Sequence, residues 1–252
     1  MTQGKKRFRT DRSYSELRSI NIKTEFIKHH PGSVMIEVGD TRVVCTAILQ
    51  DRVPFFLKGT GHGWLNAEYN MIPGSSEVRI ERPGPTRAPK GRSMEIQRLI
   101  GRSLRSVIDL SVIGERTIMI DCDVVQADGG TRTTSITGSF IALAKGIDAW
   151  IKQGIISTTP LKDYVAATSA GIVDGEFLLD LCYEEDSAAS VDMNIVMTGS
   201  GRLSEVQVTG EEATFSRDDH DKLLDLCIKG LNKIIDTEKE VLKGIFKPTI
   251  IV

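Results

Sequence analysis

Cysteine is scarce in this sequence and long apolar runs are missing, and each absence excludes a class of protein. No apolar run approaches the length of a membrane span. Residues 1–12 are basic and polar, without the apolar centre of a secretory signal. We therefore expect a cytoplasmic protein with no membrane contact. The four cysteines are isolated and three lie in apolar patterns, so we interpret them as small buried hydrophobes and not as disulfide partners or zinc ligands: Cys45, Cys122, Cys182 and Cys227.

Several familiar catalytic motifs are absent as well. The four histidines lack the spacing of a metal site. The glycine-rich segment 59–63 lacks the Lys and the Ser or Thr of a P-loop and does not fit the dinucleotide spacing, so a glycine-rich turn is the better interpretation. The sequence also contains no nucleophile elbow, no zinc-binding helix and no cysteine with an obvious base. Nothing here indicates chemistry that uses a nucleophilic side chain.

The composition is that of an ordinary globular protein, but the charge is unevenly distributed. With 252 residues, 40% of them apolar, the chain can bury a full core, and we expect a single domain over residues 1–252. Eight basic and two acidic residues lie between Arg79 and Arg105, although the net charge is only −2. Residues 1–12 form a second basic cluster, which we expect to be a flexible tail. This asymmetry indicates a surface that faces a polyanion, the alternative being a set of solvated charges.

The periodicity of the apolar residues predicts an α+β fold. Strand pairs are expected over 33–49, 165–181 and 193–208, with further strands over 64–72 and 117–124. Helices are expected after a cap at Ser93, from the turn at 129–130 to Gly154, and after a capping box at 216–219. Residues 75–91 are polar and proline-rich, which predicts an exposed, mobile loop. Because antiparallel hairpins dominate, we expect mixed layers with a loosely duplicated strand and helix plan, and not a doubly wound parallel sheet.

Residues 126–133 indicate a phosphate site. They place Gly129, Gly130, Thr131 and Arg132 between a predicted strand and a predicted helix. Paired glycines let the backbone approach a ligand, and the unpaired amides and dipole at the start of a helix favour an anion. Arg132 can add a bidentate fork to phosphate oxygens, and Thr131 can add a hydroxyl. The alternative is a Gly-Gly turn whose arginine faces solvent.

Two further features are candidates for the same chemistry. Arg92 precedes the predicted cap at Ser93, where a second guanidinium can meet an anion near another helix start. The acidic segment 184–192 places Asp186 and Asp192 six residues apart, just outside predicted strands. Their carboxylates can converge on one hard cation or share the roles of acid and metal ligand. The alternative is a solvated acidic loop, because Asp and Glu are mostly surface residues.

Longer strings of the sequence resemble bacterial ribonuclease PH. The matching strings are residues 58–64, 67–69, 91–100, 121–124, 126–137 and 185–189, in the same order, and the resemblance runs from about Arg12 to the last predicted helix. It implies the α+β ribonuclease PH fold. It also implies a phosphorolytic exoribonuclease that trims the 3′ end of precursor tRNA, with inorganic phosphate as co-substrate and nucleoside diphosphates as products. The reverse reaction adds nucleotides from diphosphates.

The resemblance further implies roles for single residues. The residues that would bind the attacking phosphate are Arg92, Gly130, Thr131 and Arg132. Asp186 would be the general acid or a ligand of Mg²⁺ or Mn²⁺, and Asp192 would be its partner in metal binding. The residues that would contact RNA are Arg79, Arg82 and Arg98. The family forms a homohexamer, a ring of three dimers whose RNA-facing loops turn inward.

The sequence departs from the family at Gly74, where relatives often carry a further arginine, and in the proline-rich stretch 82–89. Two other functions compete with phosphorolysis. One is a catalytically silent ring subunit of an exosome-like complex, but such subunits usually lack the arginine or aspartate set that this chain retains. The other is a metal-dependent hydrolytic nuclease, which would use water and release monophosphates.

Overall fold

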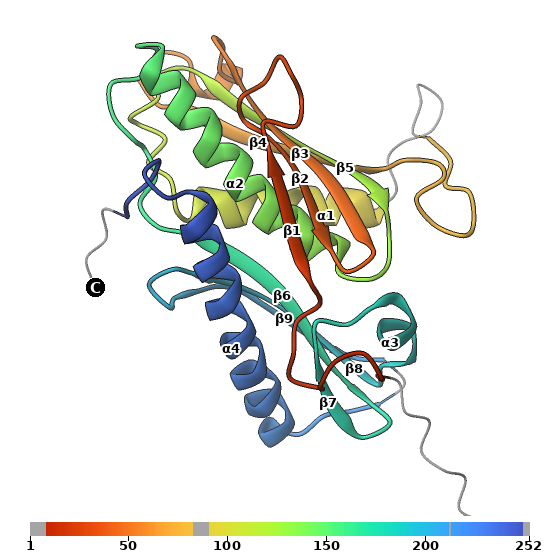
Figure 1. Ribbon diagram of the computed structural model, residues 1–252. Helices are drawn as coiled ribbons and strands as arrows, with labels where there is room; N and C mark the ends of the chain where they lie inside the picture. Colours follow the sequence, from red (N-terminus) through yellow and green to blue (C-terminus); the bar gives the residue numbers. More distant parts are fainter. Residues whose placement is uncertain (1–8, 83–90, 212, 249–252) are drawn as a thin grey trace, which may run out of the picture.

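The computed structural model describes residues 9–82, 91–211 and 213–248, which form two β-sheets with helices packed on them (Figure 1). The first sheet has the strand order β1-β2-β3-β5-β4, with bounds Ile20–Thr24 (β1), Ser33–Val38 (β2), Thr41–Gln50 (β3), Trp64–Met71 (β4) and Thr117–Gln126 (β5). The second has the order β7-β6-β8-β9, with bounds Val165–Val173 (β6), Glu176–Leu179 (β7), Val191–Thr198 (β8) and Leu203–Gly210 (β9). The helices are Gly91–Arg105 (α1), Thr131–Lys152 (α2), Tyr183–Ala188 (α3) and Arg217–Val241 (α4), with a 3-10 turn at Phe55–Leu57 (η1).

The strands form where apolar residues alternate. On β5 the buried side chains are Ile118, Ile120, Cys122 and Val124. This strand pairs antiparallel with β3 and parallel with β4. The other ladders between described strands are antiparallel, so the α+β expectation is confirmed. The β2–β3 and β6–β7 hairpins also form as predicted, around turns at 39–40 and 174–175.

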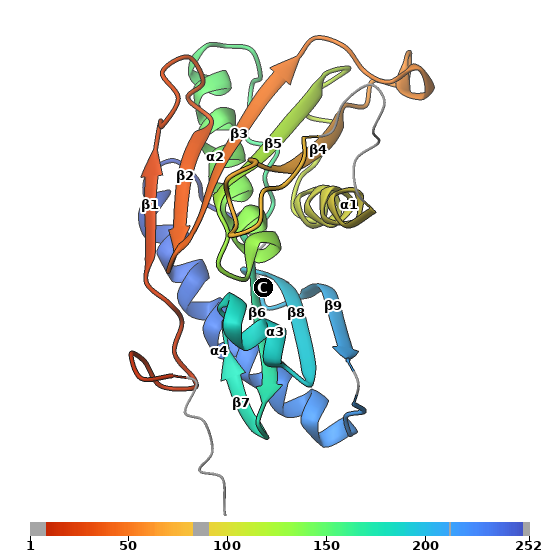
Figure 2. The same ribbon diagram turned by 90° about the vertical axis from the view of Figure 1, so that its right-hand side faces the viewer.

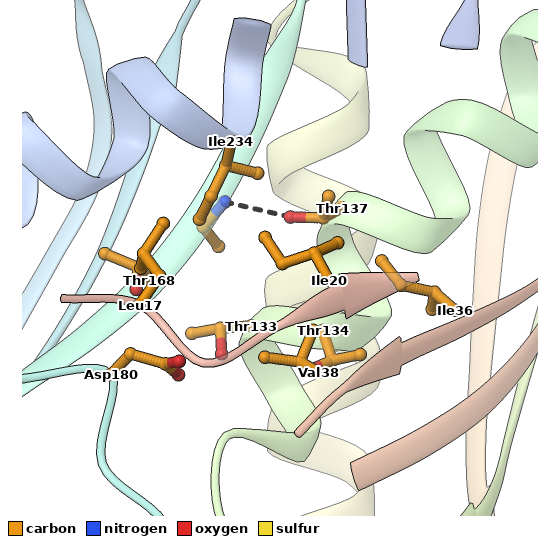
Figure 3. A pocket seen from close by; sticks show the side chains of 11 residues that line it. Leu17, Ile20, Ile36, Val38, Thr133, Thr134, Thr137, Thr168, Asp180 and Ile234 are labelled. Atoms are coloured by element: carbon orange, nitrogen blue, oxygen red, sulfur yellow. Dashed lines mark hydrogen bonds between the residues drawn. The ribbon is translucent and has the colours of Figure 1, made fainter. Parts of the chain in front are cut away.

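Helix α2 joins the two sheets into one core. It is buried along most of its length, packs on β2 and β3 of the first sheet, and also contacts β6 of the second (Figure 2). The hydroxyl of Thr137 on α2 accepts a hydrogen bond from the amide of Ala167 on β6 at 3.3 Å (Figure 3). Helix α1 covers β4, and α4 covers the second sheet. A single hydrophobic cluster contains residues of both sheets and of α1, α2 and α4, so α2 packs against both sheets.

Several boundaries differ from the sequence-based expectations. Ser93 is not a helix cap, because α1 already includes Gly91 and Arg92. The acidic segment forms the short helix α3 and not a loop, and Asp192 lies inside β8 and not outside a strand. The helix is stabilised by a capping box between Cys182 and Glu185. Residues 83–90 of the expected loop lie outside the described residues, and the preceding segment 75–82 has neither helix nor strand.

The basic cluster at the amino terminus also differs from the expectation. Residues 1–8 lie outside the described part, but Arg9 and Arg12 do not belong to an exposed tail. The Arg9 side chain is buried and donates to both carboxylate oxygens of Glu185, at 2.5 and 2.9 Å. Arg12 donates to the same carboxylate at 3.4 Å. These arginines neutralise buried carboxylates, so they do not belong to an RNA-facing surface.

The expectations for the cysteines and the last helix agree with the structure. Cys45, Cys122 and Cys227 are buried, Cys182 is half-buried, and all are free thiols. The helix α4 begins at the predicted capping box, in which Ser216 and Asp219 bond each other's backbone amides. Within the residues that the structure describes, no helix is long and apolar enough to cross a membrane.

Candidate active site

The turn between β5 and α2 has a shape that glycine permits. Gly129 and Gly130 have φ angles of 70° and 65°, in the left-handed region. A Cβ at Gly129 would lie 2.6 Å from the carbonyl oxygen of Leu181. The hydroxyl of Thr41 fixes the turn, because it donates to the carbonyl of Gly129 at 2.6 Å and accepts from the amide of Asp128 at 2.9 Å. The turn is therefore pinned between β3 and the residues that lead into α3.

This turn leaves the start of α2 open to an anion. Gly130 is the N-cap of α2 and supplies no side-chain cap, so the first amides of the helix are left for another acceptor. The hydroxyl of the buried Thr131 accepts a hydrogen bond from the phenol of Tyr69 at 2.8 Å. Its own proton is left for another acceptor. A negatively charged ligand would be stabilised here by both the amides and the helix dipole.

Arg132 lies at the meeting point of α1, α2 and β9. Its guanidinium donates to Gln207 on β9 at 2.9 Å and lies 3.8 Å from Glu95 on α1. Gln207 in turn donates to Glu95 at 3.3 Å. The Arg132 side chain is only 14% exposed, so its charge acts in a poorly solvated place, where attraction to an anion is stronger than in water.

The predicted pair of carboxylates feels the charge of these arginines. Burial raises the pKa of Asp186 on α3, while Arg92 and Arg132 act in the opposite direction. Burial also raises the pKa of Asp192 on β8, and the like charge of Asp186 raises it further. Asp192 accepts a hydrogen bond from Asn194 at 3.1 Å. Geometry connects Arg132 with Asp192, because Gln207, which bonds Arg132, lies opposite Asn194 of β8, which bonds Asp192. The effect of Arg92 and Arg132 on the pKa of Asp186 adds these residues to the same candidate site.

The donor set suits a hard divalent cation. Two partly desolvated carboxylates that repel each other are stabilised by a cation between them, and oxygen ligands are what Mg²⁺ prefers. No group of three or more His, Cys, Asp or Glu gathers for metal binding anywhere in the described part of the chain. A metal held by Asp186 and Asp192 would therefore complete its shell with water or substrate oxygens, which is the usual condition of Mg²⁺ at phosphate groups.

The arginines expected to contact RNA are exposed. Arg79 and Arg82 lie in the segment after β4, and Arg98 lies on α1. Arg82 is close enough to β5 to oppose the rise in pKa that burial causes in Asp123. The role of these three residues in RNA binding stays a prediction, because exposure alone does not identify a ligand.

Sequence reasoning missed the residues that hold the site in place. Tyr69 bonds Thr131, Gln207 bonds Arg132, and Asn194 bonds Asp192. Only Asn194 had a usable signal, since residues two apart on a strand point to the same face. The others come from strands distant in sequence, and no local pattern connects them to the turn.

The family models and several similar proteins agree with one another. The model of the 3′ exoribonuclease family, domain 1, matches residues 16–146, and that of domain 2 matches residues 163–230. Ribonuclease PH of Bacillus velezensis is 57% identical over 232 residues, which cover 92% of this chain and 95% of the relative. Ribonuclease PH of Bacillus subtilis is 56% identical with the same coverage.

Solved structures show the same fold. A chain of the Archaeoglobus fulgidus exosome with RNA bound to the active site aligns over 90% of both chains, with a TM-score of 0.77 and 23% identity. Rice Rrp46 aligns over 92% of this chain and 99% of its own, with a TM-score of 0.74 and 18% identity. These likenesses confirm the fold implied by the resemblance to ribonuclease PH.

Proposed function

From the premise that this chain belongs to the 3′ exoribonuclease family, we propose how its site acts on RNA. The protein is a phosphate-dependent 3′ exoribonuclease that trims precursor tRNA. An oxygen of inorganic phosphate attacks the last phosphodiester, the bond to the departing 3′ oxygen breaks, and a nucleoside diphosphate is released. The reverse reaction extends the chain from nucleoside diphosphates. No protein nucleophile is needed, in agreement with its absence from the sequence.

The observation that carries this proposal is the chain of contacts from Arg132 through Gln207 and Asn194 to Asp192, which joins the start of α2 to the carboxylate on β8. Phosphorolysis brings an anionic nucleophile next to a polyanionic ester, so the main task is to neutralise charge and to hold the reacting atoms in line. In our proposal, the attacking phosphate lies at the start of α2, where Arg132 and Thr131 bind its oxygens together with the amide of Gly130. Arg92 binds it from α1.

The carboxylates serve the leaving group. Asp186 and Asp192 would hold Mg²⁺ or Mn²⁺, which when bound stabilises negative charge on the scissile phosphate and the departing oxygen. In the alternative role, Asp186 is protonated, leaves the metal to Asp192 and hands its proton to that oxygen, which its raised pKa favours. Asn194 keeps the Asp192 carboxylate in place through its hydrogen bond.

RNA is the macromolecular partner of this site, as in the family. We propose that Arg79, Arg82 and Arg98 guide the strand, since all three are exposed cations near the segment between β4 and α1. We also propose a homohexamer in the cytoplasm, as the resemblance to ribonuclease PH implies. Light scattering coupled to size-exclusion chromatography gives the mass directly, and a monomer at micromolar concentration would contradict the hexamer.

A product assay tests the reaction. A precursor tRNA with a 3′ extension is incubated with the protein and Mg²⁺, with and without phosphate, and the released nucleotides are identified by chromatography. We expect nucleoside diphosphates that appear only with phosphate. Monophosphates released regardless of phosphate would instead establish a hydrolytic nuclease. Absence of release under every condition would favour a silent ring subunit.

A further inference from the structure

We propose that Arg18, a residue outside the phosphate and carboxylate sets, is a positioning residue that fixes the phosphate turn at its working distance from the carboxylates. The inference rests on the proposed function and adds to it. The phosphate residues lie in the part that matches domain 1 of the family and the carboxylates in the part that matches domain 2, so some contact must set their spacing. Arg18 makes that contact from both sides.

The guanidinium of Arg18 holds the segment before α3 with a bidentate fork. Its Nε donates to Oδ2 of Asp180 at 3.0 Å, and its Nη2 donates to Oδ1 at 2.7 Å. The backbone amide of Arg18 adds a third hydrogen bond to Oδ2 at 2.8 Å. Asp180 is a non-glycine residue with φ 55°, in the left-handed region. These three bonds hold it there, two residues before the N-cap of the helix that carries Asp186.

The same guanidinium holds the phosphate turn. Its Nη1 donates to the carbonyl of Asp128 at 2.5 Å. Its Nη2 lies so close beneath the turn that a Cβ at Gly130 would be 2.8 Å away. The carboxylate of Asp128 then accepts from the amide of Tyr183, the first residue of α3, at 3.1 Å. Arg18, Asp128 and Asp180 therefore close a small loop of contacts between the turn and α3.

This group is shielded from solvent. Arg18 is 8% and Asp180 is 3% exposed, and Figure 3 shows Asp180 next to Thr133 of α2 in the pocket that both line. Charge-assisted forks in such places are short and directional. Lysine keeps the charge but cannot make two parallel bonds to Asp180 and a third to Asp128 in one plane. The geometry of the fork, and not the charge alone, thus sets the spacing.

A displacement of the turn by about 1 Å is enough to lower a rate by about a hundredfold. The proposal predicts a specific kinetic effect of Arg18→Lys. The KM for phosphate should rise about tenfold or more and kcat should fall, whereas the KM for RNA should stay within about twofold. RNA binding is spared because the predicted RNA-guiding arginines lie on α1 and after β4.

A matched control distinguishes the positioning role of Arg18 from a general effect on stability. Ile118→Ala removes a fully buried side chain at the end of β5 remote from the turn, and should lower Tm without changing the KM for phosphate. Each variant is assayed at the same interval below its own Tm. Should Arg18→Lys fail to fold, Asp180→Asn keeps the guanidinium and the shape of its acceptor, and we expect the same rise in the KM for phosphate.

Equal KM values for phosphate in the wild type and in a folded Arg18→Lys or Asp180→Asn variant would overturn the proposal, as would an equal rise in Ile118→Ala. A wild type whose turnover does not depend on phosphate would refute the proposed function and not the role of Arg18 in particular. The wild-type phosphate titration therefore precedes the comparison of variants.

Discussion

Among single residues, Arg132 provides the sharpest test of the phosphate site. Its guanidinium is little exposed and bonds Gln207, which leaves further N–H groups for a ligand. Arg132→Ala should raise the KM for phosphate about 10- to 100-fold, because a charge-assisted hydrogen bond contributes about 1.5–3 kcal/mol. Initial rates over a phosphate titration measure this effect, and fluorescence anisotropy measures RNA binding, which should persist.

The matched control for Arg132 is Arg102→Ala. Arg102 lies on α1 and is largely exposed. Its guanidinium pairs with the carboxylate of Glu205 on β9 at 2.9 Å. Exposed ion pairs of this kind contribute little. We expect normal kinetics from this variant. Equal loss of phosphate dependence and RNA binding in Arg132→Ala would show that its role is not specific to phosphate.

Asp186 is the residue whose loss should separate activity from stability. Asp186→Asn should reduce turnover by at least about a hundredfold, because it removes the carboxyl that serves as general acid or as metal ligand. Burial raises the pKa of Asp186 above its ordinary value of 3.8 in the folded protein. A raised pKa means that the ionised carboxylate destabilises the metal-free fold as pH rises through the folded pKa. The neutral amide should therefore raise the metal-free Tm at pH 7 by about 2–4 °C for each kcal/mol regained.

Calorimetry of the metal-free wild type and Asp186→Asn at several pH values measures this difference in Tm. The difference should vanish below the pKa that Asp186 has in the unfolded chain. A turnover rate of Asp186→Asn equal to that of the wild type would show that Asp186 does not take part in the reaction. A lower Tm at neutral pH would show that the carboxylate is a structural group.

Among the elements, the turn between β5 and α2 depends on glycine in two ways. Gly129→Ala places a side chain in the left-handed region, at a cost of about 1–2 kcal/mol, and drives its Cβ into the backbone at 181–182. Gly154→Ala carries the same backbone penalty at φ 71°, with no atom within 4 Å. Both variants should lose Tm, but only Gly129→Ala should lose phosphate affinity, as thermal melts and phosphate titrations measure. Equal kinetics in the two variants would contradict the turn's role.

The long elements were predictable from the sequence because each carries its own periodicity. Helix α2 and strand β5 have a clear apolar pattern. The start of α4 is also indicated by its N-cap Ser216. Helix α3 was not predictable, because six residues are too few for a helical period and its N-cap is a cysteine. The short edge strand β1 was missed for the same reason of length.

The candidate site was predictable only in part. The turn, the arginines and the two carboxylates stand out by composition and by resemblance to ribonuclease PH, although no local pattern shows that the charge of Arg132 acts on Asp186. The supporting residues Tyr69, Gln207 and Arg18 gave no signal, because each acts through a partner far along the chain. Arg9 and Arg12 led to a wrong expectation. A basic cluster in a sequence indicates an exposed, charged segment, because the sequence does not show that Glu185 pairs with these arginines in the fold.

For the whole molecule, the buried ion pairs near the amino terminus predict the response to acid. Although burial opposes it, bonding to Arg9 and to the amide of Cys182 holds the pKa of Glu185 below its ordinary value of 4.5. A depressed folded-state pKa means that the pair stabilises the fold above about pH 4.5 and that this stability is lost as pH falls through the folded value. Glu185→Gln should therefore have a lower Tm than the wild type at pH 7, and the gap should close in acid.

Thermal melts from pH 7 down to about pH 3 measure that gap. Glu25→Gln is a suitable comparison, because the Glu25 carboxylate pairs with Lys145 at 2.8 Å but is itself largely exposed. Its effect on Tm should be small at every pH. A constant gap between wild type and Glu185→Gln over this range would show that the Glu185 carboxylate does not contribute through its charge.

In the reaction proposed for the whole molecule, orthophosphate, and not water, breaks the RNA chain at the site of Arg92, Arg132, Asp186 and Asp192. The most direct measurement uses phosphate labelled with ¹⁸O at all four oxygens, a 3′-extended RNA and Mg²⁺ in unlabelled water, with mass spectrometry of the released nucleotides. Attack by phosphate should give nucleoside diphosphates that carry all four labelled oxygens, three terminal and one bridging. Unlabelled nucleoside monophosphates would contradict it.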